Sequence, residues 1–203
     1  MTVAVGRRER KKAETRAALA RAAMRLALER GVENVTTDAI AEAADVAPRT
    51  FRNYFSGKEE AIVAELADGM RRIADRLRSR PAGEPLWDSI AHTLSFTAEL
   101  PPEVVAEMAA KVRMIRANGA LLASQLAMFE RIGEDFTEII AERTGTDARH
   151  DIYPRLVAAV VVTTLRMAVF AWLDSDGRLN LADVAADGVA RVRAGLPEPG
   201  AST

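Results

Sequence analysis

The stretch from Thr36 to Lys58, TTDAIAEAADVAPRTFRNYFSGK, constrains the fold of this chain more than any other. Thr36 is a favourable N-cap, because its hydroxyl can accept a hydrogen bond from a free backbone N–H one turn into a helix. Asp45 and Val46 can form a turn. Pro48 fits the first turn of a following helix, where its missing N–H costs nothing. The stretch therefore predicts two short helices joined by a tight turn.

The second short helix has an aromatic face and a polar face. Its aromatic residues recur at spacings of three and four, which predicts that they pack inward. They are Phe51, Tyr54 and Phe55. The residues left to face outward are Arg49, Thr50, Arg52 and Asn53. Because an arginine fork matches a guanine edge and an asparagine pairs with adenine, this face indicates a protein that enters a DNA major groove.

Two further segments complete a three-helix head. Apolar residues at helical spacing predict a helix from about Lys11 to Arg30, which Gly31 ends. Ser56 and Glu59 have the spacing of a capping box that opens the next helix, where Lys58 can meet a phosphate. The predicted small core of the head lies around Leu26, Ile40, Val46 and Phe51. A basic arm precedes the head and contains Arg7, Arg8, Arg10, Lys11 and Lys12.

The distribution of charge supports contact with DNA at one end of the chain. The net charge is −1, which by itself favours no nucleic-acid partner. However, residues 1–80 hold 17 Lys and Arg against 12 Asp and Glu, whereas residues 81–203 hold 11 against 17. A basic head on an acidic body suits a protein that touches phosphate at one end only.

Other classes of chemistry lack the residues they need. The chain has no cysteine, which excludes disulfides and thiolate sites. His92 and His150 are 58 positions apart and match no metal-ligand spacing, and no phosphate loop, GxSxG elbow or HExxH is present. We therefore expect no catalytic residue, no metal and no cofactor. The basic N-terminus lacks a following apolar segment, which predicts a cytoplasmic protein without a secretory signal.

The rest of the chain predicts an all-α fold of about nine helices. A connecting helix is expected near 57–79, and the segment 80–85, RPAGEP, is the best domain boundary. Further helices are expected near 86–99, 103–117, 119–144, 152–174 and 181–195. These patterns predict a DNA-binding domain with its basic arm at 1–56, the connecting helix at 57–80, and a ligand-binding and dimerisation domain at 81–203.

The apolar run from Leu156 to Leu173 is nearly long enough to span a membrane. Arg166 lies in its middle, and a central arginine is costly in lipid. A helix covered partly by its own domain and partly by a second subunit is the better explanation, with the helix near 181–195 as its partner. Two helices from each of two subunits would form a four-helix dimer interface, so we expect a homodimer and no membrane.

The body also carries more apolar side chains than its helices obviously need for packing, which predicts a mostly apolar cavity for a small-molecule effector. Arg113, Arg116, Asn118 and Arg166 are the polar groups that could orient an acidic head of such a ligand. The predicted ligand-binding residues are Trp87, Phe96, Met108, Val112, Arg116, Leu122, Leu126, Phe129, Arg166 and Phe170.

The motif I40-A41-x-x-A44-x-V46-x-x-x-T50-F51-x-x-Y54-F55-x-x-K58 resembles the helix-turn-helix of TetR-type transcriptional regulators. The resemblance is close over residues 7–60. It implies phosphate contacts for Thr36, Tyr54 and Lys58, and base or near-base contacts for Arg49, Thr50, Arg52 and Asn53. Asp45 departs from the usual turn glycine, although Asp tolerates a left-handed backbone better than most residues. Arg52 replaces a usual aromatic residue, which bears on operator preference.

A shorter pattern, R113-M114-I115…A120-L121…R143-T144-G145, is similar to a subgroup that includes regulators found beside mycofactocin genes. That resemblance implies an acyl-coenzyme-A-like ligand. The sequence thus predicts a homodimeric, ligand-responsive repressor that binds a palindromic operator in double-stranded DNA and is released by an apolar small molecule. An architectural DNA-binding protein without an effector is the main alternative. A helical scaffold or an enzyme is a weaker one.

Overall fold

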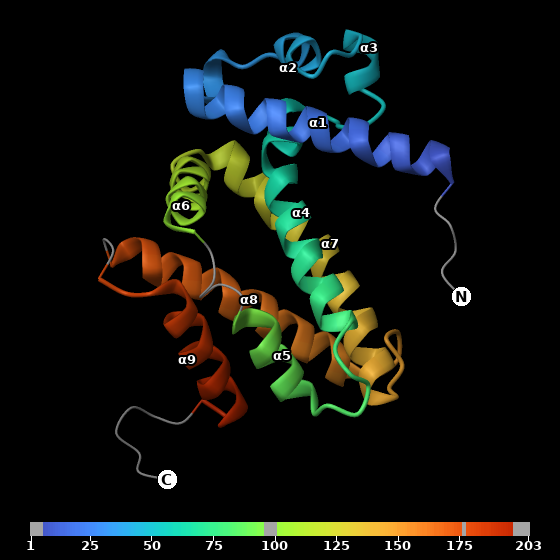
Figure 1. Ribbon diagram of the computed structural model, residues 1–203, viewed down its shortest axis with the longest axis vertical. Coiled ribbons are helices and arrows are strands. Elements are labelled where there is room, and N and C mark those ends of the chain that lie inside the picture. The colour runs from blue at the N-terminus through green and yellow to red at the C-terminus, as the bar shows by residue number, and fades with distance from the viewer. Residues whose placement is uncertain (1–5, 96–100, 176–177, 197–203) are drawn as a thin grey trace. The chain divides into compact units, whose positions relative to one another are not determined.

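The computed structural model describes residues 6–95, 101–175 and 178–196. Within these ranges there are nine α-helices, one short 3-10 helix and no strand, which confirms the predicted all-α fold. The predicted end of the helix near 86–99 lies outside the described residues. The elements are α1 (Arg7–Arg30), η1 (Val32–Asn34), α2 (Thr37–Ala43), α3 (Pro48–Phe51), α4 (Lys58–Arg78), α5 (Leu86–Leu94), α6 (Pro102–Arg116), α7 (Gly119–Thr144), α8 (Ile152–Asp174) and α9 (Leu181–Arg193) (Figure 1).

By their internal contacts, these elements form two compact units. The first, which we call the head unit, comprises residues 1–69 and 110–128. The second, the body unit, comprises residues 70–109 and 129–203. The division passes through α4, α6 and α7, so three helices contribute to both units.

The core of the head unit is built on α1, with α2 packed along it and α3 packed on α2 (Figure 1). The buried face of α1 runs from Leu19 to Ala27, and Gly31 ends the helix with a φ of 80°. Ile40 and Phe51 bring α2 and α3 onto this face, and both are almost fully buried. The start of α4 adds its four consecutive buried residues at 61–64. The head predicted from the sequence is therefore present.

The head unit also contains the corner between α6 and α7, which the sequence analysis placed in the ligand-binding domain. Ile115 and Leu121 belong to the core of the head unit and have no exposed surface. Lys111 Nζ lies 2.7 Å from Oε1 of Glu65, and the two side chains are 12% and 28% exposed. This partly buried ion pair joins α6 to α4. The corner therefore belongs to the same hydrophobic core as the helix-turn-helix.

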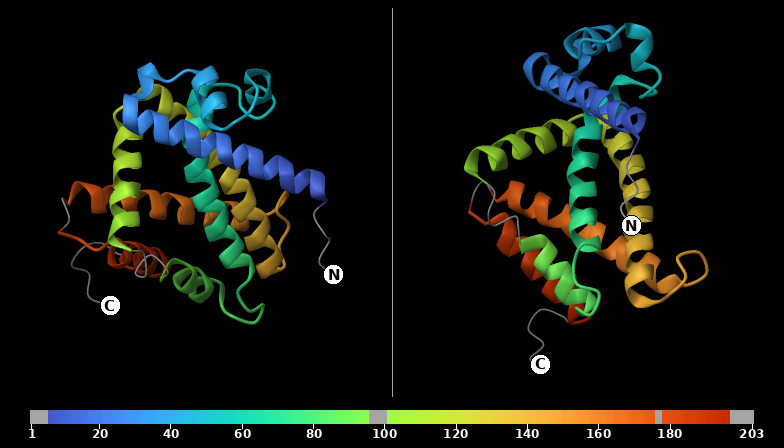
Figure 2. Two further views of the ribbon diagram at one scale, coloured as in Figure 1. Left: turned by 45° about the horizontal axis from the view of Figure 1, so that its top comes forward. Right: turned by 45° about the vertical axis from the view of Figure 1, so that its right-hand side comes forward.

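In the body unit, α9 packs against both α8 and α5 (Figure 2). The contact between α8 and α9 is close, because a Cβ placed on Gly188 would lie 2.8 Å from Cγ2 of Thr164. Any larger residue at position 188 would have to displace that methyl group. Gly188 thus permits the close approach of α8 and α9.

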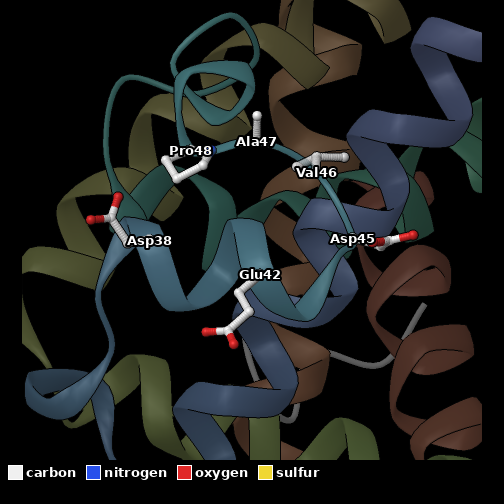
Figure 3. A pocket seen from close by; sticks show the side chains of 6 residues that line it. All are labelled: Asp38, Glu42, Asp45, Val46, Ala47 and Pro48. Carbon is white, nitrogen blue, oxygen red and sulfur yellow. The ribbon is translucent and has the colours of Figure 1, made fainter.

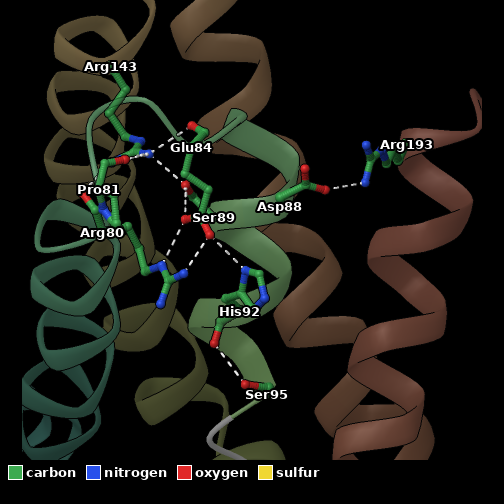
Figure 4. Close-up of polar contacts among 9 residues, drawn as sticks. All are labelled: Arg80, Pro81, Glu84, Asp88, Ser89, His92, Ser95, Arg143 and Arg193. Atoms are coloured by element: carbon green, nitrogen blue, oxygen red, sulfur yellow. Dashed lines mark hydrogen bonds and ion pairs between the residues drawn. The ribbon is translucent and has the colours of Figure 1, made fainter.

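A polar cluster fixes the loop between α4 and α5, and we call it the Glu84 cluster: Arg80, Glu84, Ser89, His92 and Arg143 (Figure 4). Arg80 and Ser89 donate hydrogen bonds to the Glu84 carboxylate, and these bonds lower the pKa of Glu84 to about 2. Arg143, on α7, donates to the backbone carbonyls of Arg80, Pro81 and Glu84. One partly buried guanidinium thus closes the loop onto α7.

Among the described residues, α8 is the one helix whose length and apolar composition would let it cross a membrane. Its most apolar stretch has a mean hydropathy of 2.1, and 39% of that stretch is buried. A core helix of a water-soluble protein can be equally long and equally apolar, so length and composition are weak evidence that α8 spans a membrane. Arg166 within the helix argues against one, as the sequence analysis noted.

Candidate DNA-binding site

The turn between α2 and α3 sets the angle at which α3 is presented. Thr36 Oγ1 accepts a hydrogen bond from Ala39 N at 3.1 Å, which confirms the predicted N-cap of α2. At the other end of α2, Val46 N donates to Ala41 O and Asp45 N donates to Glu42 O. This is the Schellman pattern, and Asp45 takes its left-handed position with a φ of 54°. The turn therefore survives without glycine, as predicted.

The α3 helix is short, and it is followed by a turn whose hydrogen bonds join residues three apart. Pro48 occupies its first turn, and regular α-helix ends at Phe51. Asn53 N and Tyr54 N then donate to carbonyls three residues earlier, at 3.1 and 2.9 Å, so the polypeptide continues as one 3-10-like turn. Arg52 and Asn53 follow the helix and are not part of it. The predicted second helix is thus one α-turn plus this tightened turn.

The two faces of this segment are divided as the aromatic spacing predicts, except at Thr50, which was expected to face outward, and Tyr54, which was expected to pack inward. Phe51 and Phe55 are buried at 1% and 3% exposure, with ring centroids 5.7 Å apart. From α1, the guanidinium of Arg16 covers the Phe55 ring at 4.7 Å, which adds a cation–π contact. Thr50 and Tyr54 are half-buried. Arg49, Arg52 and Asn53 are exposed.

Two predicted phosphate contacts have additional roles in the head. The Thr36 hydroxyl accepts the capping bond, which leaves its proton available to donate. Lys58 Nζ donates to Val32 O at 2.9 Å and is partly buried, so this ammonium also joins α4 to η1. Each Lys has three donor protons, and two remain for a phosphate. Lys58 is therefore both a structural residue and a candidate contact.

Two local predictions were wrong. The basic arm is helical from Arg7 onward, because its Arg, Lys and Glu residues are good helix formers and no Gly or Pro interrupts them. Arg7, Arg8, Arg10 and Lys11 are accordingly exposed on the first turns of α1. The residue that reaches back to Ser56 is Glu60, whose Oε2 accepts from both Ser56 N and Oγ, at 2.9 and 2.8 Å, in place of the predicted Glu59.

A hollow on the surface of the head was not predicted. It lies where α2 meets the turn and is lined by Asp38, Glu42, Asp45, Val46, Ala47 and Pro48 (Figure 3). The residues Asp38 and Glu42 are four apart on α2, and Asp45 follows in the turn, so spacing could have revealed the acidic edge. A phosphate there would meet three carboxylates, so we assign no DNA contact to this hollow.

The predicted ligand-binding residues are divided between the two units. Val112, Arg116, Leu122 and Leu126 belong to the head unit, where Val112 is buried and the other three are exposed. Trp87, Met108, Phe129, Arg166 and Phe170 belong to the body unit, and all five are partly buried. Phe96 lies outside the described residues. Within the body unit, Arg166 and Phe129 are in contact, with the guanidinium carbon 5.8 Å from the ring centroid.

The described residues contain helices and no strand, and the basic end of the chain presents a capped helix-turn-helix. This is the architecture of a DNA-binding regulator of transcription. Comparisons with known proteins identify its family. Residues 19–65 match the profile described as bacterial regulatory proteins, tetR family, and residues 84–197 match the MftR C-terminal domain. The chain belongs to the TetR family of transcriptional regulators.

Individual relatives agree with this assignment. The chain is 33% identical over 187 residues to the transcriptional regulator TcmR of Streptomyces glaucescens, covering 89% of this chain and 83% of that protein. It is 30% identical over 172 residues to the transcriptional repressor KstR of Rhodococcus jostii, covering 85% and 78%. The fold matches that of Thermus thermophilus FadR, a repressor solved with lauroyl-CoA, with a TM-score of 0.59 and 23% identity over 93% of this chain and 98% of that one.

Proposed function

We propose that this regulator is a homodimeric repressor that binds a palindromic operator and leaves it when an apolar small molecule binds. The observation that carries the proposal is the surface of exposed Arg49, Arg52 and Asn53, anchored from beneath by buried Phe51 and Phe55. Such a surface can read base edges while the rigid core holds it in place. A protein of this kind acts on chromosomal DNA, so its proposed location is the cytoplasm.

In this proposal the contacts fall into three groups. Base-edge contacts come from Arg49, Thr50, Arg52 and Asn53. Phosphate contacts come from Thr36, Tyr54 and Lys58. The exposed cations of the first turns of α1, namely Arg7, Arg8, Arg10 and Lys11, add sequence-independent affinity.

The proposed dimer interface is the face of α8 that the body unit leaves uncovered. Ile152, Leu156 and Met167 are 68%, 55% and 45% exposed, and they lie on one side of the helix. An apolar stripe of this length favours burial against a second copy. Two copies related by a twofold axis would place two heads on two half-sites, which is why we propose a palindromic operator.

The effector is proposed to be apolar and acyl-coenzyme-A-like. The match of residues 84–197 to the MftR C-terminal domain supports an effector-binding role for the body. FadR of Thermus thermophilus was solved with lauroyl-CoA, which supports testing acyl chains first. The proposed lining is the part of the predicted set that lies in the body unit and is partly buried there: Trp87, Met108, Phe129, Arg166 and Phe170.

Release of DNA requires that the effector prefer a conformation in which the two heads no longer match the operator. We propose two connections that transmit this preference. One is α4, which enters the core of the head unit through residues 61–64. The other is the corner between α6 and α7, since Ile115 and Leu121 belong to that same core. An effector that weakens DNA binding tenfold must itself be bound tenfold more weakly by the DNA complex, a coupling of about 1.4 kcal/mol.

A footprint on the DNA upstream of the protein's own gene and its neighbours tests the proposal. A repressor protects one palindromic segment, whereas an architectural DNA-binding protein spreads along the fragment. The double variant Arg49→Ala/Asn53→Ala should lose sequence preference at a cost of about 1–3 kcal/mol per contact. Arg149→Ala, which removes an exposed arginine of the body unit, is the control. Undiminished specific binding by the double variant would refute this assignment.

A further inference from the structure

Arg166 is a charged residue in the apolar helix α8, and no carboxylate among the described residues forms an ion pair with it. Its Nε is buried and has no hydrogen-bond partner. Its contact with another side chain is the cation–π contact with Phe129, at 5.8 Å.

Arg143, which also belongs to the body unit, differs from Arg166 in its polar partners. Arg143 also buries an unpaired Nε, but its other two nitrogens donate four hydrogen bonds to the loop between α4 and α5 and to Ser89 (Figure 4). Arg166 has no such set. A guanidinium stays protonated in a protein, and a partly desolvated charge without a counter-ion is costly, which the face of one aromatic ring offsets only in part.

The position of Arg166 on α8 indicates where a counter-ion could bind. Residues two apart in a helix lie on nearly opposite sides, so Arg166 and Thr164 point away from each other. The Thr164 side is closed by α9 at Gly188. The Arg166 side meets α7 at Phe129. One turn along α7 from Phe129, Gly133 has no atom within 4 Å of the place its Cβ would occupy, so there is open space on that side of α7.

We propose that Arg166 binds the anionic group of the effector, with Phe129 packing against the adjoining part of the hydrocarbon chain. This deepens the proposed function and rests on it, because it names the effector as an amphiphile: an apolar chain that ends in, or carries, an anionic oxygen group. A carboxylate of a free fatty acid and a phosphate of a thioester carrier share this chemistry. A guanidinium can donate two parallel hydrogen bonds to either group.

Titration calorimetry on the full-length protein tests the proposal, with four probes kept below micelle-forming concentrations. Dodecanoate carries a carboxylate, dodecyl phosphate carries a phosphate, dodecanol is neutral, and lauroyl-CoA carries phosphates far from the chain. The wild type should bind at least one of the three anionic probes tenfold or more tightly than dodecanol. The anion it prefers identifies the source of the charge.

Arg166→Met keeps an unbranched side chain that reaches about as far as the arginine Nε, and it removes the charge. It should abolish the preference for an anion, leave dodecanol affinity within about twofold, and raise the melting temperature of the free protein, because a poorly compensated charge is removed. Arg166→Gln provides the same affinity test if the methionine variant fails to fold. Arg149→Met, the same change at an exposed arginine of the body unit, should alter neither quantity.

An anion preference that persists in Arg166→Met or Arg166→Gln would overturn the proposal. A variant that shifts the protein to monomers would also overturn it, because Arg166 would then pair with a carboxylate of a second copy. If dodecanol releases the wild type from DNA as well as each of the three anionic probes does, the Arg166 assignment fails and the effector-responsive repressor stands. If no probe or other apolar compound changes DNA affinity, the proposed function fails and the inference fails with it.

Discussion

The side-chain amide of Asn118 donates a hydrogen bond from Nδ2 to Oε1 of Glu33 at 3.2 Å, although the two residues are 85 positions apart. The same side chain caps α7, because Asn118 Oδ1 accepts from the N–H groups of Ala120 and Leu121, both at 3.1 Å. The residue that starts α7 is therefore also fastened to η1 of the head. A displacement of the corner between α6 and α7 would therefore pull on η1 directly through this hydrogen bond, without first moving α3.

Asp45 offers a direct test of strain in the helix-turn-helix. A left-handed backbone costs a non-glycine residue about 1–2 kcal/mol, and glycine removes this cost. Glycine also increases the entropy of the unfolded chain, which cancels part of the resulting stabilisation. Asp45→Gly should therefore raise the free energy of unfolding by about 0.5–1 kcal/mol. Urea denaturation measures the change. Asp45→Ala, which keeps a Cβ and loses the polar side chain, should not stabilise, and equal gains from both variants would contradict the backbone explanation.

The local features of the head could be read from the sequence because each depends on neighbours in the chain. The Thr36 cap, the Asp45 turn and the burial of Phe51 all follow from residues within one or two helical turns. What could not be read were contacts across long separations. Ile115 packs in the head core from more than fifty positions beyond Phe51, and its own helical pattern fits either unit equally well.

Lys58 and the ligand residues show the same limit for the site. Residue type identifies Lys58 as a phosphate donor, but only the fold shows that its Nζ already donates to Val32 O. Similarly, the periodicity of α7 and α8 marks Phe129 and Arg166 as residues on helix faces, whereas their contact at 5.8 Å depends on how the two helices pack. The helical spacing of Glu59 and Glu60 was also too close to show which of them would reach Ser56.

Lys58→Met should change two properties together. Loss of the charged hydrogen bond to Val32 O should lower the free energy of unfolding by about 1 kcal/mol, since the pair is only partly buried. If Lys58 also contacts a phosphate, the slope of log affinity for DNA against log salt should fall by about one. Lys11→Met, at an exposed lysine of α1, should reduce the slope without reducing stability. If the slope of log affinity against log salt is the same for Lys58→Met and the wild type, Lys58 has only a structural role.

The contact between α8 and α9 predicts a mutation whose effect changes sign. Gly188→Ala places a Cβ 2.8 Å from Cγ2 of Thr164, and overpacking of about 1–3 kcal/mol should exceed the gain of about 1 kcal/mol in helix propensity. Thr164→Ser removes that methyl group. In the Thr164→Ser background, Gly188→Ala should therefore stabilise the protein. Thermal unfolding of the wild type, the two single variants and the double variant measures these changes in stability. If the two substitutions change stability additively, the Cβ of residue 188 does not meet the Thr164 methyl group.

The proposed dimer predicts a charge-sensitive face on α8. Leu156→Glu/Met167→Glu would place carboxylates on the exposed apolar stripe, so the protein should sediment as a folded monomer and lose at least tenfold in affinity for a two-half-site operator. Leu28→Glu, at a residue of α1 that is 39% exposed, introduces a similar charge elsewhere and should leave the dimer intact. A wild type that is already monomeric at micromolar concentration would rule out this interface.

The Glu84 cluster predicts how the stability of the body unit depends on acid. Its hydrogen bonds to Arg80 and Ser89 lower the pKa of Glu84 from its usual 4.5 to about 2 in the folded protein. A carboxylate with a depressed folded pKa stabilises the protein at pH values above its unfolded pKa, and that contribution is lost as pH falls through the folded pKa.

Glu84→Gln should therefore be less stable than the wild type at neutral pH, and the difference should shrink between about pH 4.5 and pH 2. Glu138→Gln, at an exposed glutamate of α7, serves as the control in urea titrations across this range. A difference that stays constant down to pH 2 would mean that Glu84 holds the loop through its shape alone, without its charge.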